Sequence, residues 1–144
     1  MIVLDTSILI YALGDEHRLR DPSRALLELI RDGVVRASTT IEVIQEFCDV
    51  RARRRTPAEA VARAREYARG LAPLIRPEES DLYSGLDLLE GPSQLSPLDA
   101  VLAATALRRG WALASADRAF AEVGGLSRLD PQTPAFLEAA RELG

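Results

Sequence analysis

The chain has 144 residues, 47% of them hydrophobic and 28% charged, with a formal net charge of −4. This length predicts one domain spanning residues 1–144, whose core needs neither disulfides nor a structural metal. The negative net charge argues against a nonspecific nucleic-acid binder. All 18 basic residues are arginine, which excludes chemistry that needs an amine, such as Schiff-base formation or a P-loop lysine.

Cysteine content and hydropathy indicate where the protein works. Cys48 is the single cysteine, so no internal disulfide can form and a reducing compartment is expected. No apolar run approaches the ~20 residues that a membrane helix needs, and the N-terminus lacks the layout of a signal peptide. We therefore expect a cytoplasmic protein with no membrane association.

Short apolar segments alternate with helix-start signals along the chain. In chain order, strands are predicted at residues 2–4, 34–37, 74–76, 111–115 and 126–129. A capping residue directly before proline predicts helix starts near residues 22, 57, 97 and 134. This alternation predicts an α/β fold with a mainly parallel sheet.

Two further helices are indicated by other patterns. Thr39 and Glu42 have the spacing of a capping box, in which the threonine begins the helix and the glutamate bonds back to it. The apolar residues that follow fall on one helical face: Ile41, Ile44, Phe47 and Cys48. Another helix is predicted near residues 80–90, with three leucines pointing inward: Leu82, Leu86 and Leu89.

Four acidic residues occupy positions where the expected fold would bring side chains together. Asp5 ends the first strand, and Asp117 follows two residues after the strand that ends at Ser115. Asp99 lies in the first turn of the helix beginning near residue 97, and Glu46 lies in the helix after the second strand. Ligands of open parallel sheets bind outside the carboxyl ends of the strands, so these four carboxylates could converge there.

Each acid also has a purely structural explanation. Asp5 could cap the following helix, Asp99 could be stabilised by a helix dipole, Asp117 could begin a turn, and Glu46 could be a solvated helix residue. Taken together, converging carboxylates repel one another unless a divalent cation neutralises them. Oxygen ligands without histidine favour Mg²⁺ or Mn²⁺, which can polarise a phosphodiester and activate water.

A basic cluster follows the second of these acidic motifs. It is the sequence RARRR, whose arginines are Arg51, Arg53, Arg54 and Arg55. Such a cluster can be a solvated helix end, where cations complement the dipole, or a surface that contacts phosphates. The sequence leaves both interpretations open.

Four segments, in this order and spacing, resemble a known family: VLDTSILIY, TTIEVIQEF, LSPLDAVLAATA and LASADRAF. They are similar to the PIN-domain nucleases, especially the toxins of VapBC-type toxin–antitoxin pairs. The resemblance implies a doubly wound parallel sheet and a site of four acids that holds Mg²⁺ or Mn²⁺. Matched motif by motif, the acids are Asp5, Glu46, Asp99 and Asp117.

The same resemblance implies roles for these residues in a metal-dependent endoribonuclease. Asp5 and Asp99 would hold the main metal, Asp117 would complete its ligands, and Glu46 would orient or deprotonate the attacking water. Substrate contacts would come from hydroxyls and from the basic cluster: Thr6, Ser115, Arg51, Arg53, Arg54 and Arg55. The implied partners are RNA, a cognate antitoxin and a second copy of the chain in a homodimer.

Three other functions compete with this hypothesis. A DNA-directed or housekeeping nuclease of the same superfamily would share the four acids. A non-catalytic binding module would use the acids only as caps. A phosphatase of the haloacid dehalogenase type also begins with a strand ending in Asp, but it needs a second Asp where this chain has Ser7, and a lysine that this chain lacks.

Overall fold

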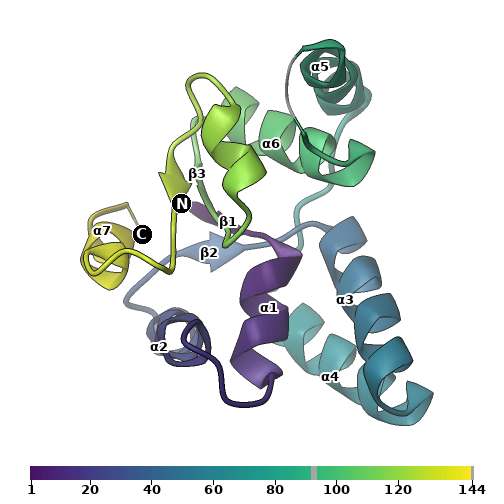
Figure 1. Ribbon diagram of the computed structural model, residues 1–144, viewed down its shortest axis with the longest axis vertical. Helices are drawn as coiled ribbons and strands as arrows, with labels where there is room; N and C mark the ends of the chain where they lie inside the picture. Colours follow the sequence, from purple (N-terminus) through teal and green to yellow (C-terminus); the bar gives the residue numbers. More distant parts are fainter. Residues whose placement is uncertain (92–93, 144) are drawn as a thin grey trace.

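The centre of the protein is a four-stranded sheet in which every strand pair is parallel (Figure 1). In the computed structural model, which describes residues 1–91 and 94–143, the strand order is β2-β1-β3-β4. The bounds are Ile2–Leu4 for β1, Ala37–Ser38 for β2, Ala112–Ala114 for β3 and Arg128–Leu129 for β4. The strand order reverses between β1 and β3, so the sheet is doubly wound, as expected.

The apolar sequence of β1 explains why this strand lies at the centre of the sheet. Ile2, Val3 and Leu4 are all fully buried, because a strand covered on both faces has no polar side to alternate with the apolar one. Val3 pairs with Ser38 of β2 on one side and with Leu113 of β3 on the other. The segment after β1 therefore leaves the sheet between two neighbouring strand ends.

The predicted strands 111–115 and 126–129 correspond to the shorter β3 and β4, and two other predicted strands differ further from the structure. The segment 34–37 forms a strand only from Ala37, because Val34 and Val35 donate their N–H groups to Leu29 O and complete the end of the preceding helix. The predicted strand 74–76 is wrong. Only one bridge forms there, between Thr40 and Ile75, because the flanking residues Pro73 and Pro77 have no N–H to extend the pairing.

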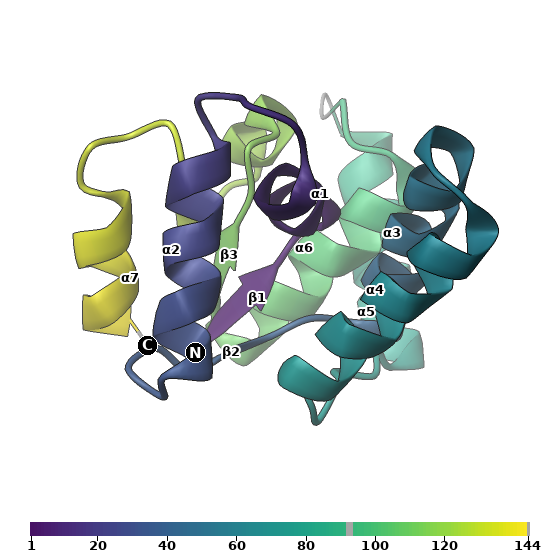
Figure 2. The same cartoon turned by 90° about the horizontal axis from the view of Figure 1, so that it is seen from below.

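Seven α-helices and one 3₁₀ helix surround the sheet within the described residues (Figures 1 and 2). The connection from β1 to β2 carries α1 (Thr6–Leu13) and α2 (Arg20–Arg31). The connection from β2 to β3 carries α3 (Ile41–Arg54), α4 (Pro57–Gly70), α5 (Glu79–Glu90) and α6 (Pro97–Arg109). The 3₁₀ helix η1 (Arg118–Glu122) precedes β4, and α7 (Phe136–Leu143) follows it.

The helices pack in pairs that the two views make plain. α3 lies along α4, α5 along α6, and α2 beside both α1 and α7. Among the residues that the structure describes, no helix is long and apolar enough to span a membrane.

Two of the predicted helix starts are confirmed by their caps. Thr56 accepts a hydrogen bond from Glu59 N (3.3 Å), and Ser96 accepts one from Asp99 N (3.2 Å), in each case with proline at the next position. The start near residue 22 is two residues late, because α2 begins at Arg20 without a side-chain cap. The start near residue 134 is two residues early, since Thr133 donates its hydroxyl to Asp130 O instead.

The predicted capping box at Thr39 and Glu42 is wrong. Thr40 caps α3 and accepts a hydrogen bond from Val43 N (3.3 Å), which shifts the helix start by one residue. The hydroxyl of Thr39 donates to Leu4 O (2.6 Å) and is therefore committed to the end of β1. Within residues 1–91 and 94–143, Glu42 has no capping role, and its buried Oε2 atom has no hydrogen-bond partner. On the predicted apolar face, Ile44 and Phe47 are buried, Cys48 is half-buried and Ile41 is 39% exposed.

The orientation of α5 also differs from the prediction. Leu82 and Leu86 are each 46% exposed, whereas Asp81 and Gly85 are buried against α6. Asp81 points inward because Arg109 of α6 pairs with it (3.0 Å). Gly85 points inward because a Cβ there would lie 2.9 Å from the backbone nitrogen of Val101. The close approach of α5 and α6 therefore depends on this glycine.

Replacing Gly85 by alanine should destabilise the fold. The new methyl group would press on the backbone of α6, which cannot yield as a flexible side chain can, and such overpacking costs about 1–3 kcal/mol. The matched control is Gly70→Ala at the end of α4, where a Cβ would meet no atom within 4 Å, so stability should hold or rise slightly. Urea unfolding of both variants measures the difference. Equal stabilities would contradict the tight α5–α6 contact.

Candidate active site

Asp5 lies at the carboxyl end of β1, where it begins α1, and it is only 4% exposed. Within the described chain, the hydrogen bonds to its carboxylate all go to Oδ2. They come from Ser7 N (3.3 Å), Ser7 Oγ (2.5 Å) and Ser115 Oγ (2.7 Å). Asp5 is thus a helix cap, as its structural explanation predicts, and it also lies at the carboxyl edge of the sheet.

Ser115 joins the ends of β1 and β3. Its hydroxyl donates to Asp5 Oδ2 and accepts a hydrogen bond from Asp117 N (3.0 Å). The side chain is fully buried, so its hydroxyl is used inside the protein and orients two of the predicted site acids. Asp117 itself is exposed and caps η1, where its Oδ1 accepts a hydrogen bond from Ala119 N (2.9 Å).

Glu46 reaches this edge from α3. The Thr6 hydroxyl, in the first turn of α1, donates a short hydrogen bond to Glu46 Oε2. Thr6 is 7% exposed and Glu46 is half-buried, so this hydrogen bond lies in the seam where α1 and α3 pack against each other. Thr6 therefore ties Glu46 to the residue that directly follows Asp5 in the sequence.

Asp99 completes the set from the first turn of α6. The Ser96 hydroxyl donates to Asp99 Oδ2 (2.6 Å), and Asp99 N donates back to Ser96 Oγ (3.2 Å). Burial raises the pKa of Asp99 to about 6, the Ser96 hydrogen bond opposes the rise, and the negative charges of Asp5, Glu46 and Asp117 add to it. The three other acids are therefore close enough for their negative charges to act on the carboxyl group of Asp99.

The chemistry of this donor set fits a hard divalent cation. The acids are carboxylates with serine and threonine hydroxyls around them, and Mg²⁺ and Mn²⁺ prefer such oxygen ligands. In residues 1–91 and 94–143, no three acidic, histidine or cysteine side chains form a preformed metal site. Each of Asp5, Glu46 and Asp99 is instead oriented by a hydroxyl group.

Ser7 is a site residue that the spacing of the acids does not reveal. Its hydroxyl donates to Asp5 Oδ2 and accepts a hydrogen bond from Ala116 N (3.1 Å), so it links α1 to the segment after β3. The only sequence signal for this role is the small hydroxyl pair that directly follows the first acid.

The basic cluster lies at the far end of α3, and most of it is paired within the protein. Arg51 makes a two-pronged contact with Glu59 (2.7 and 3.0 Å), Arg53 pairs with Asp49 (2.5 Å), and Arg55 pairs with Asp15 (3.1 Å). Arg54 has no ion-pair partner in the part of the chain that the structure describes. The four arginines predicted to bind substrate therefore differ in their freedom to do so.

The fold and this cluster of acids at the carboxyl edge of the sheet define a PIN-type domain. The family model described as PIN domain matches residues 2–126, so the chain belongs to the PIN-domain family. The resemblance found in the sequence motifs is thereby confirmed.

Individual relatives agree with this assignment. The chain is 47% identical to Ribonuclease VapC7 of Mycobacterium tuberculosis over 136 residues, which cover 91% of this chain and 92% of the relative. It is 33% identical to VapC ribonuclease Mb1869c of Mycobacterium bovis over 133 residues, which cover 90% of this chain and 99% of the relative.

Two solved structures share the fold. VapBC2 from Rickettsia felis, bound to a DNA fragment from its promoter, matches with a TM-score of 0.72 and 16% identity, over 90% of this chain and 98% of that one. A toxin–antitoxin complex from Klebsiella pneumoniae matches with a TM-score of 0.68 and 19% identity, over 91% of this chain and 98% of that one.

Proposed function

We propose that this protein is a Mg²⁺- or Mn²⁺-dependent endoribonuclease, the toxin of a toxin–antitoxin pair, acting in the cytoplasm. The observation that carries the proposal is the placement of four carboxylates on four separate segments, with the charges of Asp5, Glu46 and Asp117 adding to the rise that burial causes in the pKa of Asp99. The membership in the PIN-domain family and the identity to proteins named as VapC ribonucleases support it. RNA is therefore the proposed substrate.

The positions of the acids support a separate role for each of them. Asp5 and Asp99 would hold the metal ion, and Asp117 would complete its ligands. The ion supplies the Lewis acidity that polarises the phosphodiester and makes water a better nucleophile.

Glu46, fixed by the Thr6 hydroxyl, orients the attacking water and accepts its proton. Ser7 and Ser115 hold the Asp5 carboxylate in one orientation. Water would attack the phosphorus directly while the bond from phosphorus to one ribose oxygen breaks, and that oxygen would leave with a proton from solvent, so no covalent intermediate would form with the protein.

Glu46→Gln should lower the rate of RNA cleavage by about 10²-fold or more, the scale of lost general-base catalysis. Glu42→Gln is the matched control, since Glu42 lies one turn earlier on α3 and lines a hollow beside Leu82 and Leu98 that includes none of the four acids. That variant should cleave at nearly the normal rate. Cleavage of a labelled single-stranded RNA with Mn²⁺ measures both, and circular dichroism checks that both fold.

Each failure of this experiment has a separate meaning. An inactive Glu42→Gln beside an active Glu46→Gln would place the catalytic acid one helical turn earlier. Wild-type protein that cleaves single-stranded DNA but not RNA would favour a DNA-directed nuclease. Wild-type protein that cleaves neither, with or without Mn²⁺, would favour a non-catalytic module in which the acids only cap helices.

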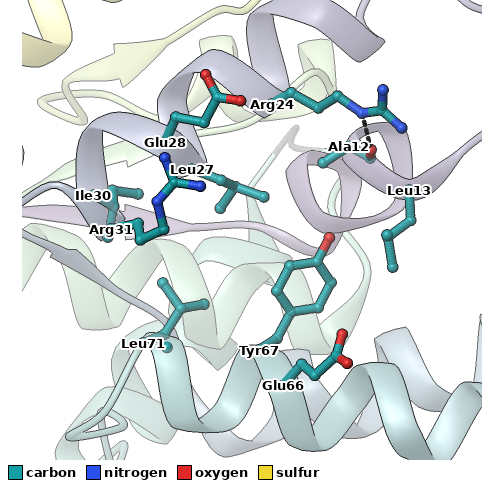
Figure 3. A pocket seen from close by; sticks show the side chains of 11 residues that line it. Ala12, Leu13, Arg24, Leu27, Glu28, Ile30, Arg31, Glu66, Tyr67 and Leu71 are labelled. Atoms are coloured by element: carbon teal, nitrogen blue, oxygen red, sulfur yellow. Dashed lines mark hydrogen bonds between the residues drawn. The ribbon is translucent and has the colours of Figure 1, made fainter.

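A groove on another part of the surface fits the antitoxin that we propose as the partner. It has a volume of about 780 Å³ and lies between α1, α2 and α4 (Figure 3). Apolar side chains line it, among them Leu13, Leu27 and Leu71, together with the ring of Tyr67. Arg24, Glu28, Arg31 and Glu66 surround them. An amphipathic segment with apolar side chains inward and charges of both signs outward would match this surface.

Two observations support this choice of partner. The structural neighbours in Rickettsia felis and Klebsiella pneumoniae are both toxin–antitoxin complexes. The groove also begins at Ala12 and Leu13, at the end of α1 opposite to Asp5, so a protein segment can lie there without touching the acids.

We further propose a homodimer, for which the exposed residues Leu82, Tyr83 and Leu86 of α5 offer an apolar face.

Leu27→Asp should weaken antitoxin binding by about tenfold or more, because it places an unpaired charge among the apolar side chains of the groove. Val61→Asp on the exposed side of α4 carries the same charge change outside the groove and should leave the affinity unchanged. Calorimetric titration with the cognate antitoxin measures both affinities, and RNA cleavage by both free variants checks their folding. Equal affinities would exclude the groove as the docking surface.

A further inference from the structure

A small hollow at the far ends of α1 and α3 collects positive charge. It has a volume of about 300 Å³ and is lined by Ile10, Gly14 and Asp15 on one side and by Arg51, Arg54 and Arg55 on the other. Arg51 pairs with Glu59 and Arg55 pairs with Asp15, so the third guanidinium group, that of Arg54, leaves the hollow with a net positive charge.

The contacts of each arginine show which one is available. Arg51 is 13% exposed in its side chain and is held by Glu59, so it is a structural link between α3 and α4. Arg55 pairs with Asp15, which also lines the hollow. Arg53 pairs with Asp49 and does not line the hollow. Arg54 is exposed, lines the hollow and has no ion pair among the described residues.

The hollow lies on the same seam as the acids. α1 and α3 follow the carboxyl ends of the neighbouring parallel strands β1 and β2 and run side by side away from the sheet (Figure 1). The Thr6–Glu46 contact is at the start of this seam, and Gly14 and Arg54 are each eight residues further along their helices. Eight residues of helix correspond to about 12 Å.

We propose that this hollow binds a backbone phosphate of single-stranded RNA through Arg54, at a position a few nucleotides from the phosphodiester at the acids. The inference rests on the proposed ribonuclease function and adds a second anchor for the substrate. Arg54 supplies the free guanidinium, whose donors match phosphate oxygens. Arg55 lies beside it, held in place by Asp15. The competing explanation is that Arg54 only complements the dipole at the end of α3.

Steady-state cleavage of a series of labelled RNA oligonucleotides, from two to ten nucleotides, separates these explanations. Arg54→Ala should raise KM about tenfold for the longer oligonucleotides, leave kcat unchanged and have no effect on the shortest ones. The slope of log KM against log salt should fall by roughly 0.7, the value for one lost phosphate contact on a single strand. Arg54→Lys should restore most of this slope, because it keeps the charge.

The matched control is Arg69→Ala, which removes another exposed arginine, from the last turn of α4, and should change neither KM nor the salt slope. If Arg54→Ala behaves like Arg69→Ala, the proposed anchor is wrong and Arg54 only ends a helix. If Arg54→Ala lowers kcat or affects all lengths equally, the anchor is also wrong. Failure of the ribonuclease function itself is distinguishable, because the wild-type protein would then cleave none of the oligonucleotides.

Discussion

The arrangement of the site depends on one buried carboxylate at the end of the central strand. Asp5 is 4% exposed, and a charge at that depth needs hydrogen bonds to compensate for lost water. Ser7 and Ser115 provide them, one from the helix that Asp5 begins and one from the end of β3. The Ser115 hydroxyl also accepts a hydrogen bond from Asp117 N. The serine that compensates Asp5 therefore also fixes the backbone of a second acid. This happens where the strand order of the sheet reverses, between β1 and β3.

The same hydroxyl-to-carboxylate pattern recurs at two of the other acids. Thr6 donates to Glu46 and Ser96 donates to Asp99, so local helix-start chemistry also orients the acids of the site. The capping and catalytic interpretations of these residues are therefore compatible. Helix starts at the carboxyl edge of a parallel sheet bring capping side chains to one place, and a divalent cation can use what this geometry gathers.

The sequence predicts those features that depend on local pattern. The fully apolar β1, the Ser96 and Thr56 caps and the acids at strand ends follow from short-range rules. The errors arise where a distant residue decides. Thr39 and Thr40 are equally good caps by sequence, and the choice is made by Leu4, whose carbonyl takes the Thr39 hydroxyl. Likewise, Arg109 and Val101 of α6 decide which side of α5 is buried, and no periodicity within residues 80–90 reveals them.

The central claim is that the four carboxylates form a site for a divalent cation, and calorimetric titration with Mn²⁺ in the absence of RNA tests it most directly. Wild-type protein should bind Mn²⁺ and melt at a higher temperature with it. Asp99→Asn should lose about tenfold or more in affinity, the scale of disrupted metal sites, while Asp87→Asn, at an exposed acid of α5, should bind normally. Wild-type protein with no heat of binding and no change in melting temperature would contradict the account.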